Sequence, residues 1–375
     1  MKYLLSFVAF FFLLNVGEAQ YTLRLGVTSA ATKPQDDIYV AGSFNNWNPK
    51  DEKYKLKPFG TSRRAILLKD IPAGKYEFKF TRGVDKWETT AKGEDIPNHE
   101  INLAGDVAQD YVVAGWKDAF PDKPRLNTAT KQVRILDTAF LIPQLGRTRG
   151  IWIYLPKGYE TAKKSYPVLY MQDGQNLFNE QTAPFGEWGV DETLDSLSAK
   201  TGKDLIVVGI DHGGDKRMTE YNPYNNSQFG KGEGKEYVDF IALTLKPFID
   251  KKYRTLSDSS HTFVAGSSMG GLISIYAIMQ YPLVFGGAGI FSPAFWTAPS
   301  IYDDVVNVKW NGLRKFYFYA GGKESDFMVP DMDKMLRIVE GKGSYKTRRV
   351  LDPLGKHNEP TWRSEFPGFV EFILQ

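Results

Sequence analysis

The stretch Thr262-Phe263-Val264-Ala265-Gly266-Ser267-Ser268-Met269-Gly270-Gly271 decides the architecture of the larger part of this chain. The apolar run over residues 261–265 predicts a strand, and the run over residues 272–280 predicts a helix. The G-x-S-x-G pattern between them predicts a sharp strand-to-helix turn that exposes Ser268, with glycine where a Cβ would crowd the turn. Ser268 is therefore a candidate nucleophile at a helix N-terminus, where the helix dipole favours negative charge.

The four histidines narrow the choice of a general base. Enzymes that use this type of turn keep the chain order serine, acid, histidine. Only His357 follows Ser268, in the glycine-bearing loop 354–359 ahead of a predicted C-terminal helix. His357 is the candidate that removes the proton from the serine. His212 follows an apolar strand and is a candidate for lining the site, although it precedes Ser268.

The acid that orients the histidine is predicted in the loop Gly321-Gly322-Lys323-Glu324-Ser325-Asp326. This loop follows the apolar run 315–320, which predicts a late strand of a sheet. An acid at the end of such a strand can accept the imidazole Nδ1–H and fix the tautomer. Glu324 and Asp326 both satisfy this requirement, so the residues alone leave the two open.

Two backbone N–H groups are expected to stabilise an oxyanion. The first belongs to Met269, directly after the candidate nucleophile. The second is expected in the turn Asp173-Gly174-Gln175, which follows the predicted strand 167–172. Gln175 is the first choice for this donor and Gly174 the second.

The segment Asp211 to Tyr221 follows the predicted strand 205–210 at the end where ligands bind in α/β sheets. One interpretation makes Arg217 and Tyr221 part of the wall that contacts the substrate. The other makes Arg217 and Glu220 a surface ion pair.

The chain from about Val133 to its C-terminus resembles the esterase D family of α/β-hydrolases, which includes bacterial siderophore esterases and feruloyl-type polysaccharide esterases. The likeness rests on residues 168–178 (VLYMQDGQNLF), Trp188-Gly189-Val190-Asp191-Glu192, Gly266 to Gly271, Gly322-Lys323-Glu324, His357-Asn358-Glu359 and Trp362-Arg363. The resemblance implies a doubly wound α/β sheet and ester hydrolysis through an acyl-enzyme. It also favours Glu324 over Asp326, because the glutamate after Gly-Lys is the recurrent acid position in such relatives.

Residues 21–114 follow a different pattern. Short apolar runs at 37–44, 64–68, 75–80 and 108–113, separated by turn residues, predict a β-sandwich of the immunoglobulin-like type. The string Gly42-Ser43-Phe44-Asn45-Asn46-Trp47-Asn48-Pro49 resembles glycogen- and starch-binding modules. The resemblance implies sugar contacts by Trp47, Lys79, Trp87 and Asn98. A purely structural role as a spacer stays open.

The first residues locate the protein. A charged start, an apolar core over residues 4–14 and small residues at 17–19 predict a cleavable signal peptide, with Gln20 as the mature N-terminus. We therefore expect a signal peptide at 1–19, a sandwich at 20–114, a linker at 115–130 and a hydrolase at 131–375. The predicted location is secreted or periplasmic, with no membrane attachment after cleavage.

Composition removes several function classes. The chain of 375 residues has no cysteine, so neither disulfides nor a lipid-attachment cysteine are expected. A net charge of +3 without basic runs does not predict nucleic-acid binding, and no ligand spacing predicts a metal or cofactor. The sequence thus predicts an exported serine esterase for acetyl or feruloyl esters of carbohydrates. The alternatives are a siderophore or other small-molecule esterase, an acyltransferase, and a non-catalytic carbohydrate-binding protein.

Overall fold

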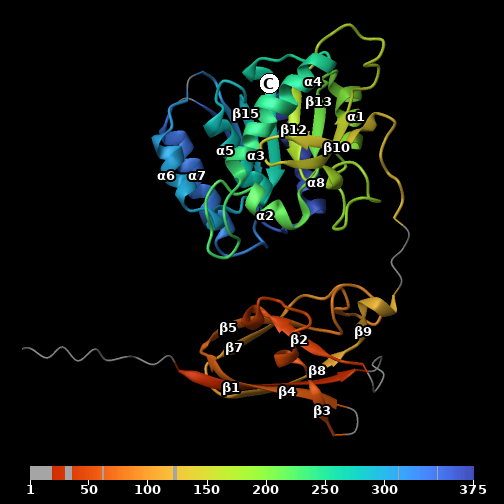
Figure 1. The fold of residues 1–375 in the computed structure, drawn as a ribbon, viewed down its shortest axis with the longest axis vertical. Coiled ribbons are helices and arrows are strands. Elements are labelled where there is room, and N and C mark those ends of the chain that lie inside the picture. Colours follow the sequence, from red (N-terminus) through yellow and green to blue (C-terminus); the bar gives the residue numbers. More distant parts are fainter. Residues whose placement is uncertain (1–18, 30–35, 61–62, 121–124, 311, 344) are drawn as a thin grey trace, which may run out of the picture. The chain divides into compact units, whose positions relative to one another are not determined.

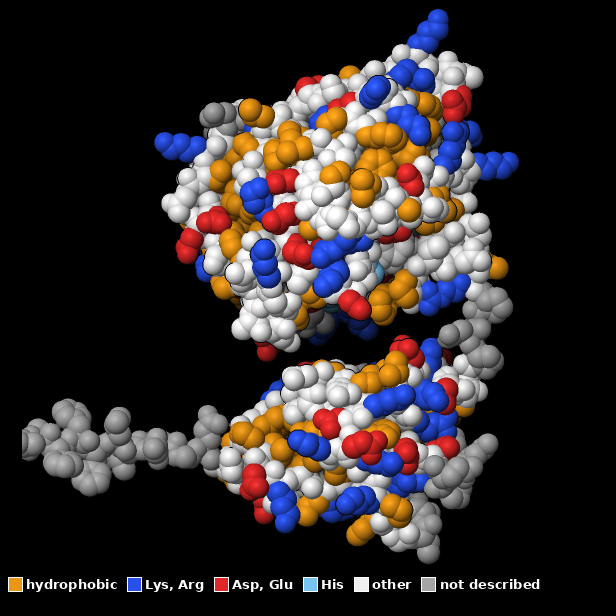
Figure 2. Space-filling model, in the orientation of Figure 1, with side chains coloured by type: hydrophobic (Ala, Val, Ile, Leu, Met, Phe, Trp, Pro, Cys, Tyr) orange, Lys and Arg blue, Asp and Glu red, His pale blue; other side chains and the backbone are white. Residues whose placement is uncertain are grey.

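The computed structural model describes residues 19–29, 36–60, 63–120, 125–310, 312–343 and 345–375. The chain divides into two compact units, Met1–Lys123 and Pro124–Gln375, each with its own core. The predicted signal peptide lies outside the described residues except for its last one, Ala19. Among the described residues, no helix combines the length and apolar character needed to cross a bilayer. Acidic and basic side chains are interspersed over the drawn face of each unit, in keeping with the small net charge (Figure 2).

The C-terminal unit is built on an eight-stranded sheet with the order β10-β11-β13-β12-β14-β15-β16-β17 (Figure 1). β10 and β11 are antiparallel to their neighbours, and the other six strands run parallel. The strands are β10 (Val133–Ile142), β11 (Arg147–Tyr154), β12 (Val168–Gln172), β13 (Ile206–Ile210), β14 (Thr262–Ser267), β15 (Gly287–Phe291), β16 (Lys315–Gly321) and β17 (Lys346–Asp352). Strands β12 to β15 are completely buried, as expected for parallel strands covered on both faces.

Helices cover both faces of this sheet, which confirms the predicted doubly wound α/β fold. One core contains side chains of α1 (Val190–Thr201) and α8 (Glu359–Ile373). The other core contains side chains of α3 (Gly234–Phe240), α4 (Lys246–Lys252), α5 (Met269–Gln280), α6 (Ser300–Asn307) and α7 (Met328–Gly341). The short α2 (Arg217–Glu220) lies in the loop region after β13. The crossovers bring the loops after β12 to β16 to one edge of the sheet.

The N-terminal unit is all-β. Its larger sheet has the order β3-β4-β1-β8 and its second sheet the order β2-β5-β7, with a small pair β6-β9. The strands are β1 (Gln20–Ser29), β2 (Tyr39–Gly42), β3 (Lys57–Phe59), β4 (Arg63–Pro72), β5 (Gly74–Thr81), β6 (Glu88–Thr89), β7 (His99–Leu103), β8 (Val107–Val113) and β9 (Gly115–Trp116). Side chains of both sheets, such as Leu25 and Phe78, share one core. The unit is therefore a two-sheet sandwich, whereas the immunoglobulin-like relationship stays a prediction.

The predicted linker, residues 115–130, starts too early. Trp116 lies in β9 and is fully buried in the sandwich core. The predicted boundary was placed before it because prolines and charges follow it in the sequence. At the other end, Thr128 Oγ1 donates to Glu187 (3.0 Å) and Thr130 N–H donates to Asp191 (2.7 Å) of the hydrolase unit. Both ends of the predicted linker thus belong to the unit beside them.

Candidate active site

Ser268 occupies a strained turn between β14 and α5. Its backbone angles are φ 58° and ψ −120°, a conformation that side-chain-bearing residues rarely adopt. Two backbone hydrogen bonds join the turn to residues 291–294: Ser268 N–H to the Phe291 carbonyl (2.9 Å) and Ala294 N–H to the Ser268 carbonyl (3.1 Å). A Cβ at Gly266 would lie 2.8 Å from Gln172 Cγ and 2.9 Å from the Gly270 carbonyl carbon. The glycine at 266 is therefore required, and the predicted turn geometry is present.

Glu324 is the acid that contacts His357. His357 Nδ1 lies 2.7 Å from Glu324 Oε2, and the Glu324 side chain is 1% exposed while that of His357 is 39% exposed. The other carboxylate oxygen accepts from Gly321 N–H and from the Ser292 hydroxyl, both at 2.7 Å. Asp326, the alternative from the sequence, is exposed. The buried, fully bonded carboxylate is the one placed to hold an imidazole.

Ser292 and Trp362 support this pair, and sequence reasoning assigned neither of them a role. Ser292 is fully buried with φ 43°, and its Oγ accepts a hydrogen bond from the Trp362 indole N–H at 2.9 Å. The Trp362 ring also packs edge-on against the His357 ring, with centroids 5.0 Å apart. Trp362 belonged to the family likeness, but the Phe291-Ser292-Pro293 sequence carries no recognisable signal.

Strand order brings Ser268 to the same edge as this pair. Ser268 follows β14, Ser292 follows β15 and Glu324 follows β16, and these three strands are adjacent and parallel. The carbonyl that binds Ser268 N–H belongs to Phe291, the residue before Ser292. The loop with His357 lies between β17 and α8. The nucleophile, base and acid candidates therefore all lie at the carboxyl edge of the sheet, where α/β folds bind ligands.

An ion pair fixes the turn predicted to supply the second oxyanion donor. Asp173 adopts the left-handed conformation (φ 57°, ψ 50°) and binds Arg217 through two contacts of 2.7 and 2.9 Å. Asp173 N–H donates to the Tyr221 hydroxyl (3.2 Å), and the Arg217 guanidinium lies over the Tyr221 ring. Tyr221 is 0% exposed, so its prediction as a substrate-contacting residue is wrong. The Tyr221 ring packs against Arg217 and its hydroxyl binds Asp173 N–H, so Tyr221 stabilises the turn 173–175.

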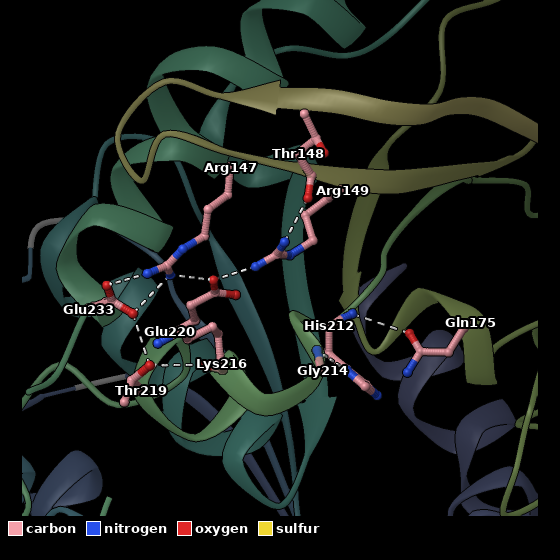
Figure 3. A network of polar contacts seen from close by, with 10 residues as sticks. All are labelled: Arg147, Thr148, Arg149, Gln175, His212, Gly214, Lys216, Thr219, Glu220 and Glu233. Carbon is pink, nitrogen blue, oxygen red and sulfur yellow. Dashed lines mark hydrogen bonds and ion pairs between the residues drawn. The ribbon is translucent and has the colours of Figure 1, made fainter. Parts of the chain in front are cut away.

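The alternative surface ion pair between Arg217 and Glu220 is also wrong. Glu220 has a 0% exposed side chain and lies between Arg147 and Arg149 of β11, both of which point toward it (Figure 3). Arg147 Nη1 lies 2.7 Å from Glu220, and Arg147 also binds Glu233. A carboxylate removed from water needs such paired charges, and the two arginines anchor the segment after β13 to the sheet.

Gln175 and His212 contact each other beside this turn (Figure 3). The Gln175 side-chain oxygen accepts from His212 N–H (3.2 Å), and His212 Nδ1 accepts from Gly214 N–H (2.9 Å). Burial lowers the pKa of His212, so its ring is neutral at pH 7 with the proton on Nε2. Burial raises the pKa of the neighbouring Asp211 to about 6, although hydrogen bonds from the Trp152 indole and the Gln175 backbone oppose this shift. His212 thus lies beside the turn, and its Nδ1 is engaged by the Gly214 N–H.

The four sandwich residues with predicted sugar contacts lie on and around β5. The rings of Trp47 and Trp87 are 6.4 Å apart at 63°, and both are half-buried. Trp87 pairs with Thr81, two residues from Lys79, and Lys79 alternates along β5 with the buried Phe78 and Phe80. Asn98 is exposed and donates to Glu77 (3.0 Å), which sequence reasoning had not singled out. The structure therefore brings the two indoles together, with Trp87 bridged to the end of β5.

Among the residues that the structure describes, no group of three or more His, Cys, Asp or Glu side chains is placed to hold a metal ion.

The fold and this site define an α/β-hydrolase type of protein. The model of the Esterase family, described as "Putative esterase", matches residues 142–373. The chain belongs to this family of carboxylic ester hydrolases.

The chain is also similar to individual proteins, including two matched by sequence and one by structure. "Uncharacterized protein YbbA" of Bacillus subtilis is 31% identical over 184 residues, which span 47% of this chain and 69% of that protein. The endo-1,4-beta-xylanase/feruloyl esterase of Xylanibacter ruminicola is 25% identical over 240 residues, 61% of this chain but only 30% of that longer enzyme. The crystal structure of enterochelin esterase from Shigella flexneri matches with a TM-score of 0.52 at 16% identity, covering 90% of this chain and 86% of that chain. This last similarity shows a common fold.

Proposed function

We propose that the protein is an exported serine esterase that removes acetyl or feruloyl groups from carbohydrates, with Ser268, His357 and Glu324 as its catalytic triad. The observation that carries this proposal is the 2.7 Å contact between His357 and the buried Glu324, at the sheet edge where Ser268 occupies its strained turn. A buried acid that holds Nδ1 leaves Nε2 of His357 to act on the serine.

The reaction follows from these positions. His357 Nε2 takes the proton of Ser268 as Oγ attacks the ester carbonyl carbon. The tetrahedral oxyanion accepts hydrogen bonds from the backbone N–H of Met269 and from the turn 173–175. Gly174 takes the role expected of Gln175 in this turn, because the Gln175 backbone N–H already binds Asp211. Collapse expels the alcohol, which takes the proton from His357, and leaves an acyl-enzyme. Water, deprotonated by His357, then releases the acid and restores the serine.

In this mechanism Arg217 is a positioning residue. It binds Asp173 and so fixes the turn 173–175 that supplies the second oxyanion donor. The bidentate ion pair is 2.7 to 2.9 Å long and is stacked on a buried tyrosine, so the turn is preorganised before substrate binds.

Two arguments support a carbohydrate ester as the substrate. The paired Trp47 and Trp87, with Lys79 on β5 and Asn98 directly before β7, form a surface suited to a pyranose, since an indole covers the apolar sugar face. One similar protein is a xylanase joined to a feruloyl esterase. A siderophore ester is the second candidate, because the similarity to enterochelin esterase extends over 90% of this chain and so includes part of the sandwich.

Hydrolysis of p-nitrophenyl acetate and butyrate by wild type and Ser268→Ala tests the catalytic proposal. We expect the variant to lose activity by about a thousandfold or more. A wild type inactive on every ester tried would favour a carbohydrate-binding protein with a vestigial hydrolase unit. A screen of acylated oligosaccharides against catecholate siderophore esters then decides between the two substrate classes.

Affinity electrophoresis in glycogen, starch and xylan tests the sandwich. Wild type should be retarded on at least one glycan and Trp47→Ala should not. Phe59→Ala is the matched control, because Phe59 is 52% exposed on β3 of the opposite sheet. Absence of retardation on all glycans would make the sandwich a spacer.

Export predicts that the mature protein begins at Gln20. Mass spectrometry of the protein recovered outside the cytoplasm checks this prediction, and a chain that still begins at Met1 would contradict cleavage.

A further inference from the structure

Three aromatic side chains from separate loops of the hydrolase unit meet at the surface. Trp296 lies 6.4 Å from Phe229 and 6.1 Å from Phe327, centroid to centroid, with both ring pairs at 65°. Trp296 is 49% exposed and Phe327 46% exposed, and Phe229 is half-buried. We call Phe229, Trp296 and Phe327 the aromatic cluster. Its edge-to-face packing holds the rings together, while about half of the Trp296 and Phe327 surface stays open to a ligand.

The aromatic cluster is connected directly to the turn of the nucleophile. Ala294 N–H binds the Ser268 carbonyl. Trp296 follows Ala294 by two residues, so the Cα atoms of Ala294 and Trp296 are at most about 7 Å apart. Thr297, the next residue, contacts the Met269 side chain through its hydroxyl (3.4 Å). Phe327 follows Glu324 by three residues and precedes α7. The aromatic cluster therefore lies near the Ser268 turn, at a distance that an acyl group carrying an aromatic ring can span.

The surrounding polar groups are already engaged. The side-chain amides of Asn222 and Asn226 both donate to the Thr297 carbonyl, at 3.2 and 2.9 Å. The Asn226 side-chain oxygen also accepts from the backbone N–H groups of Gln228 and Phe229. These bonds tie the loop of Phe229 to the segment of Trp296 before any ligand binds. Because the Asn222 and Asn226 amides already donate to the Thr297 carbonyl, they are not available to bind a sugar hydroxyl. The aromatic cluster therefore favours a flat apolar ligand.

We propose that the aromatic cluster binds the ring of an aromatic acyl group, of the hydroxycinnamoyl or benzoyl type, while the ester carbonyl reacts at Ser268. This inference rests on the proposed function and specifies which half of the ester the hydrolase unit recognises. The acyl ring packs against Trp296, with Phe229 and Phe327 at its edges. An acetyl group is too small to reach these rings and gains nothing from them.

Esters with a common leaving group test the proposal. Wild type should hydrolyse p-nitrophenyl ferulate with a higher kcat/KM than p-nitrophenyl acetate. Trp296→Ala and Phe327→Ala should lower kcat/KM for the ferulate by about ten- to a hundredfold and leave the acetate within about twofold. Phe248→Ala is the matched control, because Phe248 is an exposed aromatic of α4 packed against Phe140 and away from the aromatic cluster. It should change neither rate.

A binding measurement separates the aromatic cluster from the catalytic residues. Ser268→Ala should bind methyl ferulate in calorimetry, and adding Trp296→Ala should weaken that binding about tenfold or more. An equal loss on acetate and ferulate, or unchanged ferulate kinetics and binding in both cluster variants, overturns the aromatic site but leaves the esterase proposal intact. A loss confined to acetylated xylo-oligosaccharides would instead assign the cluster to the sugar and overturn it as an acyl site. A wild type that hydrolyses neither ester contradicts the proposed function and this inference together.

Discussion

The indole N–H of Trp362 donates to Ser292 Oγ at 2.9 Å, and the Ser292 hydroxyl in turn donates to Glu324 at 2.7 Å. Because Glu324 binds His357 and the Trp362 ring packs against His357, these four side chains form a closed loop of contacts. Helix α8 and the segment after β15 thereby fix the acid and base relative to each other. We expect this loop of contacts to set the position of the imidazole.

The closed loop predicts that its members act as a unit. Ser292→Ala removes both hydrogen bonds of the chain and Trp362→Phe removes one, and each variant should lower kcat by about tenfold with little change in KM. The double variant should be less impaired than the product of the two single effects, because either change alone breaks the chain. Multiplicative losses, measured with p-nitrophenyl acetate, would show that Ser292 and Trp362 act separately.

Glu324 and Asp326 are predicted to differ sharply in their effects. Glu324→Gln removes the charge that holds His357 Nδ1–H and should lower kcat by about a hundred- to ten-thousandfold. Asp326→Asn makes the same chemical change on an exposed neighbour two residues away and should leave kcat within about twofold. An unchanged rate in Glu324→Gln would remove this residue from the proposed triad.

Arg217 is predicted to position the oxyanion turn. Lysine cannot reproduce the two-point contact with Asp173, so Arg217→Lys should lower kcat by about tenfold for acetate and ferulate alike. If Arg217 instead contacted the substrate, KM would rise for one ester more than for the other. Lys216→Arg exchanges the same two residue types at the adjacent exposed position and serves as the control, which should leave kcat unchanged.

Asp211 makes stability depend on pH. Its pKa in the folded protein is about 6, above its ordinary value of 3.8, because burial disfavours the charged form. The folded state therefore binds this proton more tightly than the unfolded chain, and the associated stability is lost as pH rises through 6. Asp211→Asn keeps an acceptor for the Trp152 indole and removes the titration.

The variant should consequently gain stability relative to wild type as pH rises from about 4 to about 7, by up to about 3 kcal/mol. Thermal unfolding across this range measures the difference, with Asp326→Asn as the exposed control. A difference that is constant with pH would mean that Asp211 does not titrate in this window.

Most of the fold follows from local patterns. The buried strands β12 to β15 are near-continuous apolar runs, and the turn of Ser268 has glycines where a Cβ would clash. The alternation of strands and helices in the hydrolase unit could be predicted because apolar runs and turn residues mark each element in the local sequence. The end of the sandwich was misplaced because Trp116 stands next to charges and a proline, and only the tertiary packing shows that it fills a core.

The chain order serine, acid, histidine made part of the candidate site predictable. Order restricted the base to His357 and the acid to two neighbours, and burial in the structure distinguishes those two. Tyr221 was misplaced because its position after a strand cannot tell a ring that contacts the substrate from one that is buried beneath the loop. The role of Ser292 depends on Trp362, 70 residues away, and such a contact leaves no mark on local sequence.

Covalent labelling tests the central claim most directly. Wild type is incubated with a fluorophosphonate and digested, and the modified peptide is identified by mass spectrometry. We predict a single adduct on Ser268, formed at least about a hundredfold more slowly in His357→Ala and absent in Ser268→Ala. A Ser268→Ala protein that still hydrolyses p-nitrophenyl acetate at the wild-type rate, or an adduct on another residue, would contradict the account.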